Sequence, residues 1–228
     1  VPSSPRPWGI RRSVEPSLEE VNVSNRLLSS VDHLVYATVD LDEGIDEIDC
    51  LTGIRARYGG QHPGLGTRNA LAALGPLSYL EIIAPDPGQP PPQAPRPFGI
   101  DSLDESRLAG WCAKGKDLDH FREEAVRHGV PLGEVLSMSR RRPDGVVLSW
   151  RLTDLATTVA DGIVPFFIDW GESFHPSRTA IGGLSLVDLR AEHPDADRVE
   201  QMLRQLGLDL PVEQGSEPAL VAIIDGPY

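Results

Sequence analysis

Two ionisable residues in apolar, strand-like stretches are the first candidates for chemistry in this 228-residue chain. Glu81 is the one charged residue in the run YLEIIAP, and His33 lies in the run VDHLVYATVD. Because successive side chains of a strand point to opposite faces, Glu81 shares a face with Tyr79 and Ile83, opposite to Leu80. A buried carboxylate needs a cation, a metal ion or several hydrogen-bond donors. The expected partner of Glu81 is His33.

A divalent metal ion commonly takes two histidines and one carboxylate on one side, which leaves positions open for substrate. His33 and Glu81 supply two such ligands. His62 and His175, each followed by a proline in a polar loop, are the candidates for the third. Glu81 is also the candidate catalytic residue, as a base that transfers a proton. The plainer interpretation is that His33 and Glu81 form a hydrogen-bonded core pair, and that His62 and His175 fix their loops.

Five further residues are candidates for contacts with a substrate. Arg68 and Asn69 follow the glycine-rich loop HPGLGT, where they either hold a substrate carboxylate or carbonyl or simply anchor the loop. Arg141 lies in the run SRRRPDG, which is either a solvated turn, the favoured interpretation, or an anion clamp. Trp150 and Trp170 lie in predicted strands and are candidates to line an apolar cup, although strand aromatics are most often plain core. The loop lacks the lysine and the helix of a phosphate-binding P-loop.

Composition limits the classes of partner. A hydrophobic fraction of 40% suits a folded protein, and a net charge of -13 argues against nucleic acid or an anionic membrane as the main partner. No apolar run approaches the length of a membrane span, and the first residues lack the apolar core of a secretory signal. Cys50 and Cys112 lie in apolar, periodic segments and look like core residues. With no disulfide framework, the expected location is the reducing cytoplasm.

The chain begins with an arm over residues 1–30, rich in proline, serine and arginine, with a short helix predicted over 17–28. A first module then covers 31–86. Its predicted elements are a strand over 31–38, a helix from the cap Asp40-Leu41-Asp42 to Leu51, and strands over 54–58, 67–74 and 78–84. Gly53 is expected to end the helix.

The same order recurs after a proline-rich linker, 87–106. The second Asp-Leu-Asp sequence begins at Asp117, which is 117 − 40 = 77 residues after the first, and Gly129 ends the second helix, 76 residues after Gly53. This second module covers 107–171. A third, partial unit with the order strand, helix, strand, strand covers 182–228. The sequence therefore predicts an α+β fold of tandem βαβββ modules with a partial βαββ unit at the C-terminal end.

The motifs DHLVYAT, HPGLGTRN, YLEIIAP, MSRRRPDG and PFFIDWGESFHP resemble the vicinal oxygen chelate superfamily, closest to its glyoxalase-like domain branch. The resemblance implies modules of the glyoxalase, bleomycin resistance and dioxygenase kind, paired as a cupped barrel around a divalent metal such as Zn, Fe, Mn, Ni or Mg. Ligands would come from the first and last strands of each module, here His33 and Glu81. The equivalents in the second module are Gly110 and a residue near Phe167, and neither can bind a metal.

Two functions agree with this resemblance. The first is a metal-dependent lyase, isomerase or dioxygenase that acts on a small carbonyl or oxygen-chelating substrate, with the metal as a Lewis acid. The second is a metal-free protein that binds a drug or metabolite, which the ligand-free second module favours. The resemblance also implies a homodimer.

Overall fold

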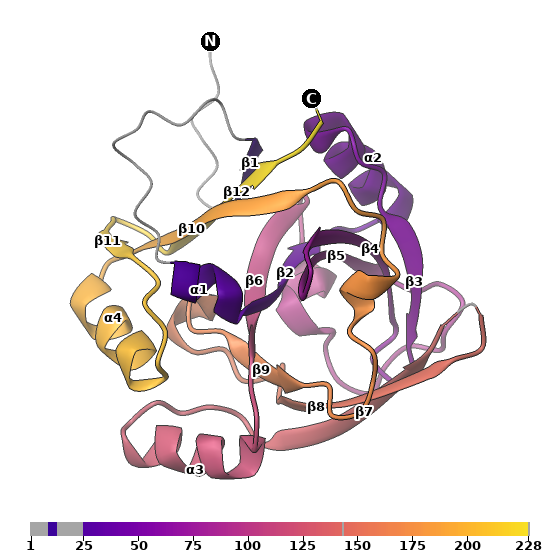
Figure 1. Ribbon diagram of the computed structural model, residues 1–228. Helices are drawn as coiled ribbons and strands as arrows, with labels where there is room; N and C mark the ends of the chain where they lie inside the picture. The colour runs from indigo at the N-terminus through magenta and orange to yellow at the C-terminus, as the bar shows by residue number, and fades with distance from the viewer. Residues whose placement is uncertain (1–8, 13–24, 143, 228) are drawn as a thin grey trace.

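The computed structural model describes residues 9–12, 25–142 and 144–227 (Figure 1). Its largest element is an eight-stranded sheet in the order β3-β4-β5-β2-β6-β9-β8-β7. The sheet curves until its outer strands, β3 and β7, are in contact, so that it forms an almost closed barrel. The predicted α+β fold is confirmed.

The first module contains β2 (Val31–Ala37), α2 (Leu41–Thr52), β3 (Arg57–His62), β4 (Thr67–Gly75) and β5 (Ser78–Pro85). Asp40 caps α2 as predicted, because its carboxylate accepts hydrogen bonds from two backbone N–H groups of the first turn. Gly53 ends the helix with φ 76°. The strand predicted over 54–58 is displaced: pairing with β4 extends β3 through two glycines to His62, which therefore lies on a strand.

The second module repeats this order with β6 (Arg107–Lys114), α3 (Leu118–Arg127), β7 (Val135–Arg141), β8 (Val147–Thr153) and β9 (Phe166–Asp169). The modules meet where β2 pairs antiparallel with β6, and each continues outward through its fourth, third and second strands. This order gives the barrel an approximate two-fold axis. The second Asp-Leu-Asp sequence precedes α3 as the first precedes α2, but it does not repeat the cap, because the backbone of Asp117 is left-handed (φ 46°) and its side chain makes no capping hydrogen bond.

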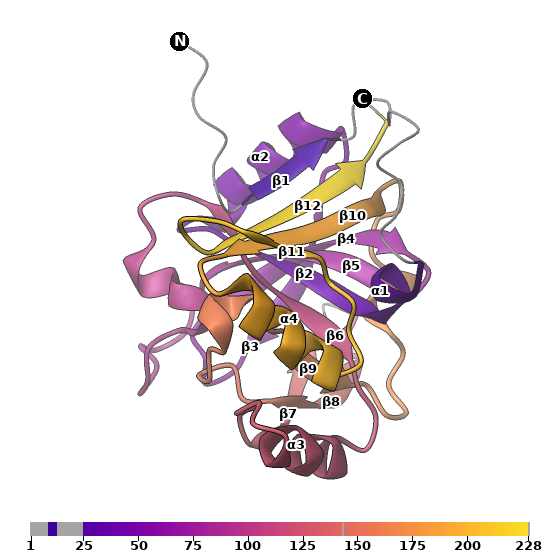
Figure 2. The same ribbon diagram turned by 90° about the vertical axis from the view of Figure 1, so that its left-hand side faces the viewer.

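The C-terminal unit has the predicted order, with β10 (Ser185–His193), α4 (Ala196–Gln205), β11 (Val212–Gln214) and β12 (Ala219–Asp225). Together with β1 (Gly9–Arg12), which runs parallel to β12, these strands form a second sheet that lies against the outside of the barrel (Figure 2). α1 (Asn25–Ser30) precedes β2. Most of the helix predicted over 17–28 lies outside the described residues.

Short 3-10 turns complete the connections, at η1 (Pro97–Ser102), η2 (Ala160–Gly162) and η3 (Pro176–Arg178). The main core lies between the outer face of the barrel, α2 and the second sheet. It includes Leu34, Ile82 and Trp111 from the barrel and Leu189 from the second sheet, each at most 1% exposed. This packing fixes β2, β5 and β6 and leaves their inner faces for the site.

Residues Leu80, Ile82 and Ala84 face this core, as alternation predicted. Cys112 is buried, whereas the prediction for Cys50 is wrong: it lies on the exposed side of α2. None of the described helices is both long and apolar enough to cross a membrane.

Candidate functional site

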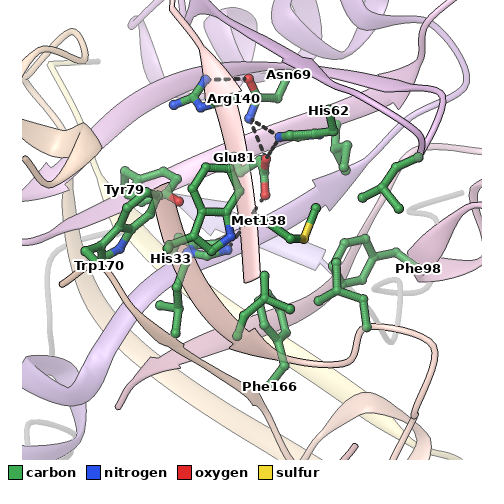
Figure 3. Close-up of a pocket in the computed structure, with 16 residues that line it drawn as sticks. His33, His62, Asn69, Tyr79, Glu81, Phe98, Met138, Arg140, Phe166 and Trp170 are labelled. Atoms are coloured by element: carbon green, nitrogen blue, oxygen red, sulfur yellow. Dashed lines mark hydrogen bonds and ion pairs between the residues drawn. The ribbon is translucent and has the colours of Figure 1, made fainter. Parts of the chain in front are cut away.

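A cavity of about 40 Å³ lies inside the barrel (Figure 3). This volume has room for one or two water molecules. Polar residues from five strands meet at one side of it, and apolar side chains such as Phe98, Met138 and Phe166 line the rest. The polar set is His33 from β2, His62 from β3, Asn69 from β4, Glu81 from β5 and Arg140 from β7.

His33 and Glu81 meet, as predicted. His33 Nε2 lies 3.7 Å from Glu81 Oε2, and the two residues are 3% and 7% exposed. Strands β2 and β5 are parallel neighbours, and their register places His33 beside Tyr79 and Val35 beside Glu81. The imidazole of His33 stacks on the Tyr79 ring with centroids 4.6 Å apart. Both functional groups therefore belong to rigid central strands.

Asn69 joins Glu81, His62 and Arg140 in one hydrogen-bond network. Its Nδ2 donates to Glu81 Oε1 at 2.5 Å and lies 3.3 Å from His62 Nε2, while Arg140 donates to its Oδ1 at 3.2 Å. A guanidinium has only donors, so the amide oxygen must face Arg140 and the amide NH₂ must face Glu81 and His62. His62 Nε2 then accepts, and its Nδ1 donates to Thr67 Oγ1 at 3.0 Å.

Burial lowers the pKa of His62; the charge of Glu81 opposes this effect and the charge of Arg140 adds to it. The neutral imidazole that the network requires is therefore also the form that burial favours. His62 Nε2 lies 3.6 Å from Glu81 Oε1, so each oxygen of the carboxylate faces one histidine.

Asp32 is a residue of the site that the sequence did not reveal as functional. It is 1% exposed, and an irregularity in the pairing of β2 with β6 falls between Val31 and His33, at Asp32. Asp32 Oδ1 lies 2.8 Å from His33 Nδ1, and Oδ2 accepts from Trp170 Nε1 at 3.1 Å and lies 3.2 Å from His175 Nε2. The available signal was an acidic residue next to His33 within an apolar strand.

The carboxylate of Asp32 is ionised. Burial raises the pKa of Asp32, but hydrogen bonds from His175 and His33, together with their charges, lower it to about 2. An ionised Asp32 accepts the Nδ1–H of His33, which leaves Nε2 facing Glu81 at the cavity. In the tautomer with its one proton on Nδ1, His33 Nε2 is an acceptor that faces a second acceptor, Glu81 Oε2.

Trp150 adds a donor to this cavity. Its indole Nε1 is buried and has no hydrogen-bond partner within the described residues, although the side chain is only 7% exposed. A buried donor without a partner is costly. The cavity thus offers a facing pair of acceptors and one unsatisfied donor. The two acceptors would bind a cation or a hydrogen-bond donor, and the indole N–H would bind an acceptor atom of the same ligand.

The other predicted site residues lie at different distances from this cluster. Trp170 lines the cavity with Trp150. His175 does not lie beside Glu81; it lies against Asp32, and its Nδ1 accepts from the backbone N–H of Ser177 at 3.2 Å. The structure therefore gives His175 contacts that orient Asp32 and does not bring it to the cavity as a ligand.

The two predicted arginines also lie away from the cavity. Arg68 is on the face of β4 opposite to Asn69, because neighbours on a strand point in opposite directions. Arg141 is exposed and donates to the backbone oxygen of Gly145. Its neighbour Arg140 faces inward instead. The sequence did not identify Arg140, because a run of three arginines does not reveal which member the strand buries.

The second module supplies no metal ligand at the equivalent positions. Val35 pairs with Gly110 across the two-fold axis. Cys112 is the equivalent of Val35, and Cys112 pairs with Phe166 in the same way that Val35 pairs with Glu81. The equivalent of Glu81 is therefore Phe166, one residue before the expected Phe167. Gly110 and Phe166 make this half of the barrel apolar.

Two groups of described residues have the chemistry to hold a metal ion. In the first, ligand atoms of Asp32, His33 and Cys112 lie within 4.8 Å of one another. However, N–H groups already occupy both oxygens of Asp32, and burial raises the pKa of the Cys112 thiol well above 9.0. This group is therefore a poor metal site, because a thiol binds metal as the thiolate.

The second group is His33 Nε2, His62 Nε2 and Glu81, a donor set of two imidazoles and a carboxylate. Its neighbouring ligand atoms are 3.7 Å and 3.6 Å apart. Tetrahedral bonds of about 2.0–2.2 Å place neighbouring ligand atoms about 3.4 Å apart. The two distances run to different oxygens of Glu81, and among the described residues only the first group has all its ligand atoms within 4.8 Å of one another. The second group has the chemistry for a divalent ion but needs side-chain movement to hold one, with the Asn69 amide turned away from Glu81 and His62.

Three solved structures are similar to this chain, and the first of them supports the architecture. A hypothetical protein from Staphylococcus aureus aligns with a TM-score of 0.57 at 17% identity, over 87% of this chain and 86% of that one. A methylmalonyl-CoA epimerase in complex with methylmalonyl-CoA and NH₄⁺ aligns with a TM-score of 0.43 at 18% identity, over 64% of this chain and 98% of its own. The epimerase from Mycobacterium tuberculosis gives 0.41 at 18% identity, over 65% and 93%.

No curated protein matches the sequence. The model of one family, described as a glyoxalase-like domain, matches residues 31–207, which span both modules of the barrel and reach the end of α4. Tandem βαβββ modules, an inward-facing His33 and Glu81 and this match over most of the chain agree with one another. The chain belongs to the glyoxalase-like domain family of the vicinal oxygen chelate superfamily.

Proposed function

We propose that the protein is a divalent-metal-dependent enzyme that transfers a proton at a carbon next to a carbonyl group, as isomerases and lyases do. One observation carries this proposal: His33 Nε2 and Glu81 Oε2 face each other 3.7 Å apart at a cavity, and both are acceptors in the neutral His33 tautomer with its proton on Nδ1. Two facing acceptors attract a cation or a donor between them. His33, His62 and Glu81 would hold the metal. When bound, it would supply Lewis acidity that polarises the carbonyl oxygen.

The residues of the chain divide the remaining tasks. Asp32 holds His33 with Nε2 toward the cavity. With the Asn69 amide turned away, Glu81 would hold the metal through Oε1, which leaves Oε2 to accept a proton from the substrate carbon and return it. Trp150 Nε1 donates a hydrogen bond to the substrate oxygen as negative charge develops there. Arg140, behind Asn69, would keep its hold on the amide oxygen.

The cavity limits the substrate. About 40 Å³ accepts only a small carbonyl end, and the recess beside it has about 270 Å³ and shares Phe98, Leu155 and Phe166 with it. A larger substrate would place its apolar part in this recess after these side chains move. We place the enzyme in the cytoplasm, because both described cysteines are free and a reducing compartment keeps an exposed thiol such as Cys50 reduced. A homodimer remains the expectation from the superfamily.

Elemental analysis of protein purified without chelator tests the proposal. We expect about one divalent ion per chain in the wild type and at least a tenfold lower content in His33→Ala, because removal of a ligand costs a large part of the affinity. His120→Ala is the matched control, since His120 is exposed on α3. It should retain the metal. A wild type that remains metal-free after loading with each divalent ion and desalting contradicts the proposal.

The second candidate is a metal-free binding protein for a small molecule. Two observations favour it: Asn69 already satisfies Glu81 and His62 with hydrogen bonds, and Gly110 and Phe166 replace the ligands of the second module. In that case Trp150 and the two acceptors would bind the ligand directly. The two candidates differ in the same experiment, because only the enzyme retains a stoichiometric ion that His33→Ala loses.

A further inference from the structure

A second recess, of about 200 Å³, lies at the closure of the barrel where β3 approaches β7, beside the turn η3. It is separate from the inner cavity, and Arg140 is the lining residue that the two share. Arg57 and Arg142 line the recess together with Arg140, and the one carboxylate among its lining residues is Asp144. Three positive charges and one negative charge leave a net charge of +2 in a chain whose overall charge is -13.

Arg140 forms the buried wall of this recess. It is 4% exposed, and its hydrogen bond to the neutral amide of Asn69 is its one polar contact within the described residues. It forms no ion pair with a described carboxylate. Figure 3 shows one nitrogen of the guanidinium on Asn69 and the others directed away from Glu81. A buried guanidinium without an anion is costly, so its remaining donors favour an anionic partner.

Gly59 on β3 makes room for this arrangement. A Cβ atom at this position would lie 2.5 Å from Asn69 Oδ1 and 2.7 Å from Arg140 Nη1, closer than side chains approach. The guanidinium therefore passes close to the backbone of β3 because residue 59 has no side chain. The recess is a built feature of the β3–β7 closure and not a chance gathering of surface arginines.

The other two arginines differ in their partners. Arg142 pairs with Asp144 at 2.8 Å, which offsets part of its charge. Arg57 is exposed and forms no ion pair within the described residues. Guanidinium groups bind phosphate and carboxylate through paired N–H donors. A phosphate group carries a charge of about −1.5 to −2 near neutral pH, which balances the net charge of +2 in the recess. A single carboxylate would balance only half of that charge.

We propose that this recess binds a phosphate group between Arg57, Arg140 and Arg142. The ligand is inorganic phosphate or the phosphate of a small phosphomonoester. The recess, at about 200 Å³, has the volume of about six water molecules, which is enough for such a group. The site is distinct from the cavity of the proposed enzyme and does not depend on that reaction. Arg140 also donates to Asn69, which in turn donates to Glu81, so the phosphate and Glu81 lie at opposite ends of one hydrogen-bonded chain.

Calorimetric titration of inorganic phosphate into the full-length protein near neutral pH tests the proposal without any assay of activity. We expect saturable binding with a Kd in the range of about 1 mM or tighter. Arg57→Gln/Arg142→Gln should weaken it by about tenfold or more, since each charged hydrogen bond contributes strongly. Asp144→Asn should tighten it, because it removes the competing carboxylate. Arg141→Gln is the matched control on the same hairpin and should bind within about twofold of wild type.

Two further ligands identify the source of the phosphate. Tighter binding of glycerol phosphate than of inorganic phosphate indicates an organic phosphomonoester, and equal or weaker binding indicates free phosphate. Acetate that binds as tightly as phosphate overturns the assignment to phosphate. The site itself is refuted by titrations that do not saturate, or by an Arg141→Gln variant that loses as much affinity as the double variant. Circular dichroism confirms that the exposed substitutions leave the fold unchanged.

Discussion

Asn in place of Asp32 tests how the buried carboxylate supports the site. In the wild type, Asp32 Oδ1 and Oδ2 receive N–H groups from His33, Trp170 and His175. An asparagine retains one acceptor oxygen and presents an NH₂ group to the other donors. At about 1.5–3 kcal/mol for each hydrogen bond to a charged group, two lost bonds cost about 3–6 kcal/mol. We expect Asp32→Asn to lower the free energy of unfolding by this amount at neutral pH.

The pH dependence gives a sharper number. Lowering the pKa of Asp32 from 3.8 to about 2 corresponds to about 2.4 kcal/mol of folding free energy, at about 1.36 kcal/mol for each pKa unit. Because the folded pKa lies below the unfolded one, the unfolded chain takes up the proton first as pH falls. The contribution is therefore complete above about pH 4 to 5 and is lost toward pH 2. At pH 3 about 1.1 kcal/mol of it has gone.

Urea unfolding, followed by tryptophan fluorescence from pH 6 to pH 3 on chelator-treated protein, measures this effect. The difference between wild type and Asp32→Asn should shrink by about 1.1 kcal/mol over this range, since the variant lacks the titrating group. Asp104→Asn, at an exposed position, should give a curve parallel to wild type. Parallel curves for Asp32→Asn and wild type would show that the folded protein does not depress this pKa, and the reasoning on the tautomer of His33 would fail with it.

Three other substitutions test local parts of the structure. Gly59→Ala should push Arg140 off Asn69 and destabilise the protein by about 1–3 kcal/mol, measured by thermal unfolding, because it overpacks a closed wall. Asp40→Ala should cost about 1 kcal/mol as a lost helix cap, whereas Asp117→Ala should cost much less, which urea unfolding of the pair can compare. Phe98→Ala should join the inner cavity to its neighbouring recess, and increased quenching of tryptophan fluorescence by acrylamide would report it.

The parts of the fold that local patterns determine were predictable from the sequence. Alternation in YLEIIAP placed Glu81 on the inner face with Tyr79, as observed. The 77-residue repeat predicted the element order of both modules. The pairing of β2 with β6 agrees with it, because Val35 pairs with Gly110, the equivalent of His33, and His33 pairs with Cys112, the equivalent of Val35. The equivalence also identified the second module as free of ligands. These predictions depend only on periodicity of two residues within strands and on internal repetition.

The parts that depend on irregular backbone were not predictable in this way. An irregularity at Asp32, within the β2–β6 pairing, accompanies its contact with His33, whereas strict alternation would separate the two side chains. The choice between Arg140 and Arg141 depends on the register of β7 in the hairpin, which a run of three arginines leaves open. Asp117 has the same sequence context as Asp40 but a left-handed backbone, so the repeated motif does not repeat the cap.

The loss of two-fold symmetry at the centre of the barrel defines how a ligand would lie there. The first module contributes His33 and Glu81, while the equivalent positions of the second contribute a glycine and Phe166. A Cβ atom built on Gly110 would have only Phe98 within 4 Å, at 4.0 Å, so this half keeps open space where its counterpart has an imidazole. A polar end therefore fits beside Glu81 and an apolar part beside Phe166, because the reverse orientation buries unpaired polar groups. The asymmetry gives the proposed substrate one orientation in the barrel.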